Sequence, residues 1–372
     1  MSKLKKWLSY PLIWIFGLFL LGFTLADLLA PQKSFSDFEN RYLKQRPSPT
    51  LKTVFNGSFA SNYESYLNDQ FLFRNSWISL KSYGESALFK VENNGVVYGK
   101  HDRLFEKYQS FSEEQLKKNL TYLKAFLERH PSSTFAIVPS SYTVYPQDLP
   151  AGLQQVNQSA EIETIRQELS DTAENLDLLT LLQKQQSESL YYRTDHHWTT
   201  DGAYLAYRAF CEQKGLRPVE LSTLTRHDVE GFYGTYFNKC KKVSIPSDTL
   251  TWYEFPLTSV TVDGEEKGAY LDLSALETRD KYASFLWGNN GVTVLKSRET
   301  DDPSRILLIK DSFANCLAPF FTANYDEVWV VDLRSLPNGM TQLMEETEFD
   351  DILVLYNFEN LASDTNLYRL SR

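Results

Sequence analysis

An acidic residue, two imidazoles and an indole stand side by side in residues 192–207, which read YRTDHHWTTDGAYLAY. Only one residue separates Asp195 from His197, so in an extended segment their side chains project to the same side. A carboxylate next to an imidazole suits general acid–base catalysis, because it fixes the tautomer and stabilises the protonated ring. We expect Asp195 to orient His197, while His196 and Trp198 orient the loop.

A second segment supplies a nucleophile. The run RILLIKDSF of residues 305–313 is typical of a buried strand that leads into Ser312 at the start of a helix. At the carboxyl edge of a parallel sheet such a serine meets ligands, and the first N–H groups of the helix can hold an oxyanion. A serine attacks only when a base takes its proton, so Ser312, His197 and Asp195 predict a Ser-His-Asp triad.

Each of these residues also has a structural interpretation. A serine after an aspartate is often a helix N-cap, a DxH pair is often a satisfied hydrogen-bond network, and a tryptophan often serves packing alone. Two-metal DHH phosphoesterases and DHHC acyltransferases share part of the tetrapeptide, but the aspartate motifs of the first and the cysteine and zinc region of the second are not evident in the sequence. Metal binding by Asp195, His196 and His197 remains a minor alternative, and we predict no metal and no cofactor.

The elements that must hold these residues alternate between helix and strand patterns. Ser110 and Glu113 predict a capping box for a helix with leucines along one face of residues 116–127. The patterns then predict a strand at 134–138, a helix at 161–169, an apolar run at 176–182, a strand at 306–309, a short helix at 312–320, a strand at 327–331, a helix at 341–348 and a strand at 352–356. This alternation is typical of an α/β fold with a largely parallel sheet.

Composition along the chain predicts its domains. Residues 31–60 are polar and interrupted by prolines, which is typical of a stalk. Between about residues 218 and 304, short aromatic-rich runs with scattered glycines predict a β-rich insertion. We therefore expect a cytoplasmic tip and transmembrane anchor at 1–30, a stalk at 31–60, and a single catalytic domain at 61–372 that contains the insertion.

The N-terminal segment is apolar. No charge falls between Trp7 and Ala26, and a helix of about 20 residues spans the roughly 30 Å apolar core of a bilayer. Three lysines precede it, so the positive-inside rule leaves the N-terminus in the cytoplasm and the remainder outside. A cleaved signal peptide is the alternative, although its apolar region is usually shorter, about 7–15 residues. We expect a single-pass protein of the cell membrane with an extracytoplasmic catalytic domain.

Charge and cysteine content exclude other classes. The net charge of −10 and the lack of a Lys/Arg-rich block argue against a nucleic-acid partner, whose phosphates require a basic face. Cys211, Cys240 and Cys316 are widely spaced and form no CxxC pair, so the sequence predicts neither a zinc site nor a disulfide framework. Buried thiols are expected, with a Cys211–Cys240 bridge as the alternative.

Taken together, these motifs resemble those of the DHHW proteins, which are related to the SGNH hydrolase-like alginate O-acetyltransferases (AlgX/AlgJ-like). The resemblance covers nearly everything after the stalk. Its blocks are ENRYL, NGSF, LNDQFLFRNSWI, NNGVVYGK followed by RLF, VPSSYTVYPQDLP, TDHHWTTDGAY, FYGTYFNK and KDSF. The resemblance implies an SGNH hydrolase-like three-layer fold.

The resemblance also implies roles for the predicted triad. Ser312 takes the acyl group, and His197 acts as general base and then as general acid. In SGNH enzymes the serine block comes first and a DxxH block comes last, so this chain has a rearranged order. Lys310 also stands where their GDS block has glycine, which places the oxyanion hole in question.

Three further residues are candidates for side-chain oxyanion donors or substrate contacts. Tyr356 and Asn357 end the last predicted strand, and Asn289 lies in a GNN run of the insertion. They are chosen by position, and a structural role is the alternative for each.

The function implied is a membrane-anchored extracytoplasmic O-acetyltransferase that modifies a cell-surface or secreted polysaccharide through an acyl-serine intermediate. The implied partners are a polysaccharide acceptor and a membrane acyltransferase of the MBOAT type as acyl donor. The same triad would make a carbohydrate esterase if water accepted the acyl group. A noncatalytic glycan-binding scaffold of the cell envelope is an alternative from a different class.

Overall fold

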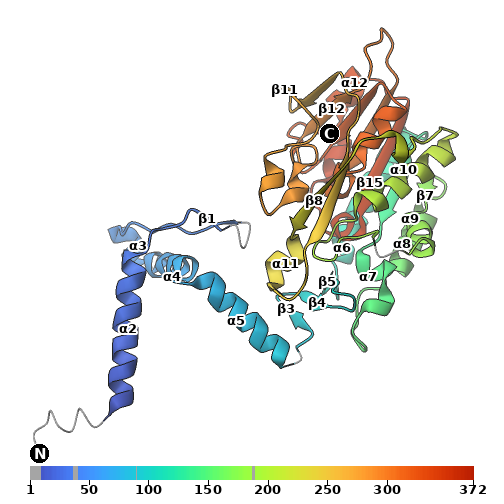
Figure 1. Cartoon of the computed structure of the whole chain (residues 1–372). Helices are drawn as coiled ribbons and strands as arrows, with labels where there is room; N and C mark the ends of the chain where they lie inside the picture. Colours follow the sequence, from blue (N-terminus) through green and yellow to red (C-terminus); the bar gives the residue numbers. More distant parts are fainter. Residues whose placement is uncertain (1–9, 37–40, 89, 187–188) are drawn as a thin grey trace, which may run out of the picture. The chain divides into compact units, whose positions relative to one another are not determined.

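The structure is a computed structural model that describes residues 10–36, 41–88, 90–186 and 189–372. The chain divides into two compact units (Figure 1). One unit contains Met1–Phe89 with Lys241–Val243, and the other contains Lys90–Cys240 with Ser244–Arg372. All the residues predicted to act chemically lie in the second unit, which we call the C-terminal unit. The predicted domain boundaries at residues 30 and 60 stay predictions.

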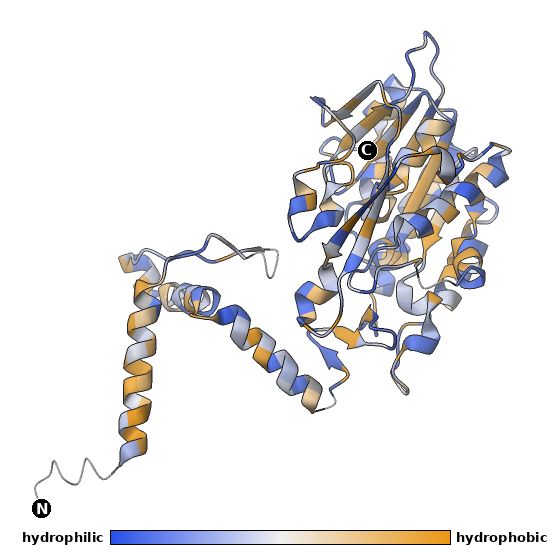
Figure 2. Ribbon diagram, viewed as in Figure 1, coloured by the Kyte–Doolittle hydropathy of each residue, from blue (hydrophilic) through white to orange (hydrophobic). Residues whose placement is uncertain are grey.

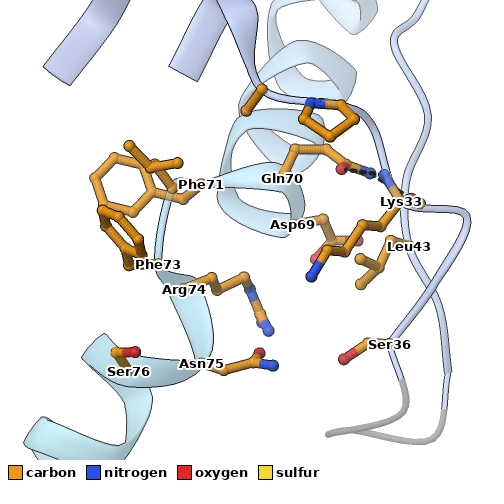
Figure 3. Close-up of a pocket in the computed structure, with 13 residues that line it drawn as sticks. Lys33, Ser36, Leu43, Asp69, Gln70, Phe71, Phe73, Arg74, Asn75 and Ser76 are labelled. Carbon is orange, nitrogen blue, oxygen red and sulfur yellow. Dashed lines mark hydrogen bonds between the residues drawn. The ribbon is translucent and has the colours of Figure 1, made fainter. Parts of the chain in front are cut away.

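The N-terminal unit is mostly helical. Its elements are α2 (Pro11–Leu29), the strand pair β1 (Phe35–Ser36) and β2 (Arg41–Tyr42), α3 (Leu51–Phe55), α4 (Ser58–Gln70) and α5 (Arg74–Ala87). A cavity of about 450 Å³ lies within this unit, between the chain after α2 and the junction of α4 and α5 (Figure 3). Gln70 ties its two sides together, because its side chain accepts from Lys33 N at 2.9 Å and donates to Lys33 O at 2.8 Å.

The predicted membrane span from Trp7 to Ala26 begins in residues 1–9, which lie outside the described residues. From Pro11 onward the span is part of α2, whose side chains are largely apolar (Figure 2). Among the described residues, the length and apolarity required to cross a membrane are not found together in any helix. The prediction of a transmembrane helix is therefore not confirmed.

A sheet of eight strands forms the centre of the C-terminal unit. Across the sheet the strands are β11 (Glu265–Lys267), β10 (Ser259–Val262), β12 (Val292–Lys296), β14 (Glu327–Val331), β13 (Arg305–Lys310), β15 (Asp351–Asn357), β6 (Thr134–Val138) and β7 (Glu174–Leu176). From β14 to β7 all neighbours pair in parallel, whereas β12, β10 and β11 are antiparallel. The predicted α/β fold with a largely parallel sheet is confirmed.

Alternate residues of the buried strands face two separate cores, because successive side chains of a strand point to opposite faces. On one face, Leu308 and Leu355 pack with α9 (Leu178–Lys184) and α10 (Thr200–Lys214). On the other face, Ile309 and Val354 pack with α6 (Glu113–Arg129), α8 (Gln158–Leu169) and α13 (Phe358–Ser363). The apolar colouring of the strands in Figure 2 follows this burial. The sheet thus lies between two helical layers.

The insertion predicted at 218–304 contributes to the sheet and to the site. Its strands β10, β11 and β12 extend the main sheet, while β8 (Arg226–Phe232) and β9 (Asp248–Tyr253) form a separate antiparallel pair. Between β8 and β9 lies α11 (Thr235–Cys240), and the short 3₁₀ helix η4 (Lys281–Ser284) precedes β12. Both α11 and η4 reach the predicted triad.

The remaining elements of this unit are a second, small sheet and a set of short helical segments. A three-stranded antiparallel sheet contains β3 (Glu92–Asn93), β4 (Val96–Tyr98) and β5 (Leu104–Glu106). Short helical segments are α7 (Ser141–Val144), η1 (Pro146–Asp148), η2 (Leu221–Thr223), η3 (Ala275–Glu277), η5 (Ser312–Asn315), η6 (Ala318–Ala323), α12 (Thr341–Glu346) and η7 (Leu367–Ser371).

Two local predictions require correction. The N-cap of α6 is Ser112, whose side chain accepts from Gln115 N at 3.2 Å, so the predicted capping box at Ser110 is wrong. The short helix predicted at 312–320 consists of two 3₁₀ helices, η5 and η6. The three cysteines are all buried and none forms a disulfide, so the expectation of buried thiols is confirmed.

Candidate active site

The site lies at the carboxyl edge of the parallel strands. β13 ends at Lys310, and the chain continues through Asp311 into Ser312, the first residue of η5. The neighbouring strand β15 ends at Asn357, and β6, which pairs with β15, ends at Val138. Carboxyl ends of parallel strands meet at one edge of a sheet, which is where such sheets bind ligands.

The segment DHHW forms a turn directly before α10. Thr199 is the N-cap of α10 and accepts from Gly202 N at 3.2 Å. The turn begins at Thr194, whose N–H and hydroxyl both donate to Asp248 Oδ2, at 2.8 and 2.6 Å. Trp198 is fully buried and donates from Nε1 to Phe313 O at 2.7 Å. Trp198 therefore joins the histidine turn to the serine turn, although the two are more than a hundred residues apart.

Within this frame His197 lies between the carboxylate and the serine. Its Nδ1 is 2.5 Å from Asp195 Oδ1, and its Nε2 is 2.8 Å from Ser312 Oγ. With the proton on Nδ1, His197 donates to Asp195 and can accept the Ser312 proton on Nε2. Ser312 is 9% exposed and His197 is 6% exposed, so the group is nearly closed to water. His197 thus lies within hydrogen-bond distance of both Asp195 and Ser312, as predicted.

The carboxylate of Asp195 is held by backbone groups as well. Oδ1 also accepts from His197 N at 2.9 Å, and Oδ2 accepts from Thr235 N at 2.6 Å. Thr235 begins α11, and the residue before it is Gly234. A Cβ at position 234 would overlap the Asp195 carboxylate, so only glycine fits there. These two residues come from the FYGTYFNK block, whose part in the site the sequence did not reveal.

Burial and charge determine the ionisation of this group. Burial alone would raise the pKa of Asp195, but His196, His197 and the hydrogen bonds that it accepts hold this pKa well below its usual range. Burial and the adjacent His197 lower the pKa of His196 to about 4, so His196 is neutral at pH 7. Asp195 therefore stays ionised and can stabilise a protonated His197.

Tyr282 is a contact that sequence reasoning missed. It comes from η4 of the insertion, and its ring lies parallel to the His197 imidazole, with centroids 3.8 Å apart and an interplanar angle of 9°. Its hydroxyl donates to Ser312 O at 3.0 Å. The tyrosine thus touches both the base and the nucleophile turn, and no motif around it signalled this.

The turn at Ser312 is held by Asp311. Its Oδ1 accepts from Phe313 N at 2.9 Å, and its Oδ2 accepts from Asn357 N and from Asn360 Nδ2, each at 2.7 Å. Burial raises the pKa of Asp311, whereas these three hydrogen bonds lower it. Because the Phe313 N–H is engaged, the Ser312 N–H is the amide of this turn that can face an oxyanion.

The three position-based candidates lie in different surroundings. Asn357 donates from Nδ2 to Val138 O at 3.0 Å and accepts from Glu359 N at 3.0 Å as the N-cap of α13. Tyr356 lies in the core on the opposite face of the sheet. Asn289 Oδ1 accepts from Lys310 Nζ at 3.0 Å, so it supports the strand end before Ser312. These contacts favour the structural role for Tyr356 and Asn289, whereas Asn357 also lines a small pocket beside the serine turn and stays a candidate contact.

Lys310, which stands where SGNH enzymes have glycine, is buried and points to Asp332 at the end of β14. Lys310 Nζ lies 3.2 Å from Asp332 Oδ2, and Arg334 binds the same carboxylate oxygen at 2.6 Å. Burial lowers the pKa of Lys310, and Asp332 opposes this. The lysine thus forms part of an ion-pair network beside the serine turn.

Asp195, His196 and His197 could also offer ligand atoms to one metal ion, because these atoms lie within 4.8 Å of one another. Both ring nitrogens of His197 are already hydrogen-bonded, to Asp195 and Ser312, and so are both oxygens of Asp195. A metal would have to replace these hydrogen bonds, so the donor set fits a hydrogen-bonded acid–base group better than a metal centre.

Comparisons with solved structures find similar proteins. A DHHW family protein from Eubacterium siraeum shares the fold with a TM-score of 0.63 and 23% identity, over 76% of this chain and 96% of that chain. Bacillus cereus PatB1 with a sulfonyl adduct matches with a TM-score of 0.61 and 19% identity, over 74% of this chain and 97% of that chain. The O-acetyltransferase domain of Pseudomonas putida AlgJ matches with a TM-score of 0.47 and 17% identity, over 75% of this chain and 99% of that chain.

None of the curated proteins compared with the chain matches it significantly. The profile of the family described as DHHW protein matches residues 84–331, which is more than half of the chain and includes the DHHW turn and Ser312. The chain therefore belongs to the DHHW protein family.

Proposed function

We propose that this protein is a polysaccharide O-acetyltransferase of SGNH hydrolase-like type, with Ser312, His197 and Asp195 as its catalytic triad. The observation that carries the proposal is the position of His197, which contacts Asp195 Oδ1 through Nδ1 and Ser312 Oγ through Nε2. The acetyl group and the polysaccharide acceptor are inferred from the motif resemblance. The fold shared with PatB1 is consistent with both inferences.

The proposed reaction has two halves. In the first, Ser312 Oγ attacks the donor carbonyl while His197 Nε2 takes its proton, and the leaving group departs with that proton. In the second, a sugar hydroxyl oxygen attacks the acyl-serine, His197 takes the hydroxyl proton, and Ser312 recovers it as the ester bond to the enzyme breaks. Asp195 stabilises the protonated imidazole in both halves, and the Ser312 N–H faces the developing oxyanion.

The site and its surroundings suggest how water is kept out. Ser312 and His197 are nearly buried, and Tyr282 covers the imidazole face. A sugar that fills the entrance would exclude water and favour transfer over hydrolysis. We further propose that the domain works outside the cytoplasmic membrane and receives its acyl group from a membrane acyltransferase of the MBOAT type.

The test is to incubate the purified full-length protein and Ser312→Ala with a chromogenic acetyl ester, with and without oligosaccharide acceptors, followed by mass spectrometry of the sugar. Acetylated sugar that disappears with Ser312→Ala supports the transferase. Acetate release that depends on Ser312 without any transfer would instead identify an esterase.

Labelling provides an independent test of the nucleophile. Because a PatB1 structure carries a sulfonyl adduct, a small sulfonyl fluoride is a suitable probe. We expect a single mass addition on the peptide that contains Ser312, and its loss in Ser312→Ala and His197→Ala. Equal labelling of the wild-type protein and Ser312→Ala would contradict the proposed function.

A further inference from the structure

A small pocket opens beside the serine and histidine turns, within the C-terminal unit. Its volume is about 190 Å³. The lining residues that matter here are Glu106, His196, Thr235, Lys239, Phe313 and Glu359. Sites for drug-sized ligands begin at about 300 Å³, so this pocket has room for a single small ring rather than an oligomer.

The pocket is lined by residues that contact or adjoin the proposed triad. Phe313 follows Ser312, and its ring centroid lies 5.0 Å from that of His197. His196 precedes His197, with ring centroids 3.8 Å apart. Thr235, on a third side, donates its N–H to the Asp195 carboxylate. A molecule in this pocket would therefore lie next to the turns that carry His197 and Ser312, whose neighbours His196 and Phe313 line the pocket.

Glu359 is a half-buried acid that the mechanism does not use. Its Oε1 accepts from Ser140 Oγ at 2.6 Å, and its N–H donates to the Asn357 side chain at 3.0 Å. In the described part of the chain, no hydrogen bond is formed by its other carboxyl oxygen, Oε2, although Glu359 lines the pocket. Burial raises the pKa of Glu359 to about 7, and Glu106 adds to this while Ser140 and Lys239 oppose it.

The other polar groups of the pocket suit hydroxyls rather than a carboxylate. Lys239 is the cation of the lining, and its Nζ is already bound by both oxygens of Glu106, at 3.1 and 3.0 Å. The pocket therefore has two carboxyl groups, and its Lys239 amine is already paired with Glu106. This balance disfavours binding of an anionic ligand. Phe313 adds an aromatic wall against which the apolar face of a sugar ring can pack.

We propose that this pocket is the acceptor subsite and holds one uncharged sugar residue, whose hydroxyl binds Glu359. The inference rests on the proposed function and deepens it, because it selects neutral polysaccharides over uronate polymers as substrates. Glu359 anchors the ring while a neighbouring hydroxyl of the same residue reaches the acyl group on Ser312.

Binding tests this without requiring turnover. A panel of neutral tetrasaccharides and their uronate counterparts is titrated calorimetrically into the full-length Ser312→Ala variant and into Ser312→Ala/Glu359→Gln. We expect at least one neutral tetrasaccharide to bind more tightly than its uronate counterpart. At pH 8, where Glu359 is mostly ionised, the Glu359→Gln change should weaken that binding about tenfold, because a charged hydrogen-bond acceptor is replaced by a neutral amide. Glu346→Gln, an exposed glutamate on α12, is the matched control and should bind normally.

A second measurement separates this inference from the proposed function. Glu359→Gln in the otherwise wild-type chain should raise the KM for the neutral acceptor by a larger factor than it lowers the kcat of Ser312-dependent cleavage of the acetyl ester. Preference for uronates, failure of every neutral tetrasaccharide to bind, or unchanged binding in Glu359→Gln would overturn the subsite. Ester cleavage that survives Ser312→Ala would overturn the proposed function. The calorimetric titrations would then still show whether the pocket binds a neutral sugar through Glu359.

Discussion

His197 uses both ring nitrogens, one for Asp195 and one for Ser312, and the parallel ring of Tyr282 covers one of its faces. The two hydrogen bonds fix the distances of the imidazole from Asp195 and Ser312, and the stacked tyrosine fixes the plane of its ring. An aromatic face also favours a positive charge above it, by about 0.5–2 kcal/mol depending on desolvation. Tyr282 is therefore expected to position the base and to support its protonated form.

Substitutions of Tyr282 separate its two contacts. Tyr282→Phe keeps the ring and removes the hydroxyl, with its hydrogen bond to Ser312 O and its longer ones to Phe313 O and Cys316 Sγ, and should lower kcat about fivefold. Tyr282→Leu also removes the stacked ring and should lower kcat about thirtyfold or more, with the KM for the acetyl ester little changed. Steady-state kinetics checks this, with thermal unfolding as control for folding. Equal losses in both variants would show that the ring itself does not matter.

Glu359 makes the stability of the fold depend on pH. Its pKa is about 7 in the folded protein, above the ordinary value of 4.5, so between these values only the folded state keeps the proton. The resulting stabilisation is present below about pH 4.5 and is lost as pH rises through 7, by on the order of 3 kcal/mol. Urea unfolding of wild type and Glu359→Gln at pH 5 and pH 8 measures it. From pH 5 to pH 8 we expect the free energy of unfolding of the wild type to fall relative to that of the variant. Identical pH dependence of the two proteins would refute the raised pKa of Glu359.

At the scale of elements, the site depends on short segments more than on long helices. The turn after β13 presents Ser312, the turn before α10 presents Asp195 and His197, and the start of α11 holds the Asp195 carboxylate. These connections lie on a rigid sheet, which lets loops carry chemistry with little freedom. The contact of α11 with Asp195 requires a close approach at Gly234.

Substitution of Gly234 tests this approach. In Gly234→Ala the added Cβ would overlap the Asp195 carboxylate, so either the carboxylate or the start of α11 must move. A displacement of about 1 Å at such a site lowers activity about 100-fold, which is the loss that we expect in ester cleavage. Gly268→Ala is the matched control, since an added Cβ there meets nothing within 4 Å. Similar activity of the two variants would contradict this role of Gly234.

At the scale of the whole molecule, the chemistry is confined to one unit. The central sheet and every residue proposed to act lie in Lys90–Cys240 and Ser244–Arg372. The N-terminal unit has its own helices and its own cavity at Gln70. The proposed reaction therefore does not require residues from α2 to α5.

Removal of residues 1–89 tests this independence. We expect the shortened protein to fold and to cleave the acetyl ester at a rate within about twofold of the full-length chain, because its two cores are complete. Circular dichroism and steady-state kinetics measure both properties. A folded but inactive fragment would show that the N-terminal unit contributes to the site.

Local patterns in the sequence predicted much of the fold. Strands such as β13 and β15 are continuous apolar runs, and their alternation with helices indicated a parallel sheet. Local reasoning failed where neighbouring residues compete for the same role, as when Ser112 rather than Ser110 caps α6. It also placed one helix where the chain forms the two 3₁₀ helices η5 and η6.

By itself the sequence predicted which residues carry chemistry, because Asp195, His197 and Ser312 have the types and spacing of an acyl-transfer triad. Only the tertiary structure decided their partners. Tyr282 and Gly234 lie far from the DHHW turn in sequence, and neither has a local signal, since a stacked ring and a close backbone approach depend on how distant segments pack. Tyr356 and Asn357 show the converse: the end of a strand is visible in the sequence, whereas the face to which each side chain turns depends on the layers packed against the sheet.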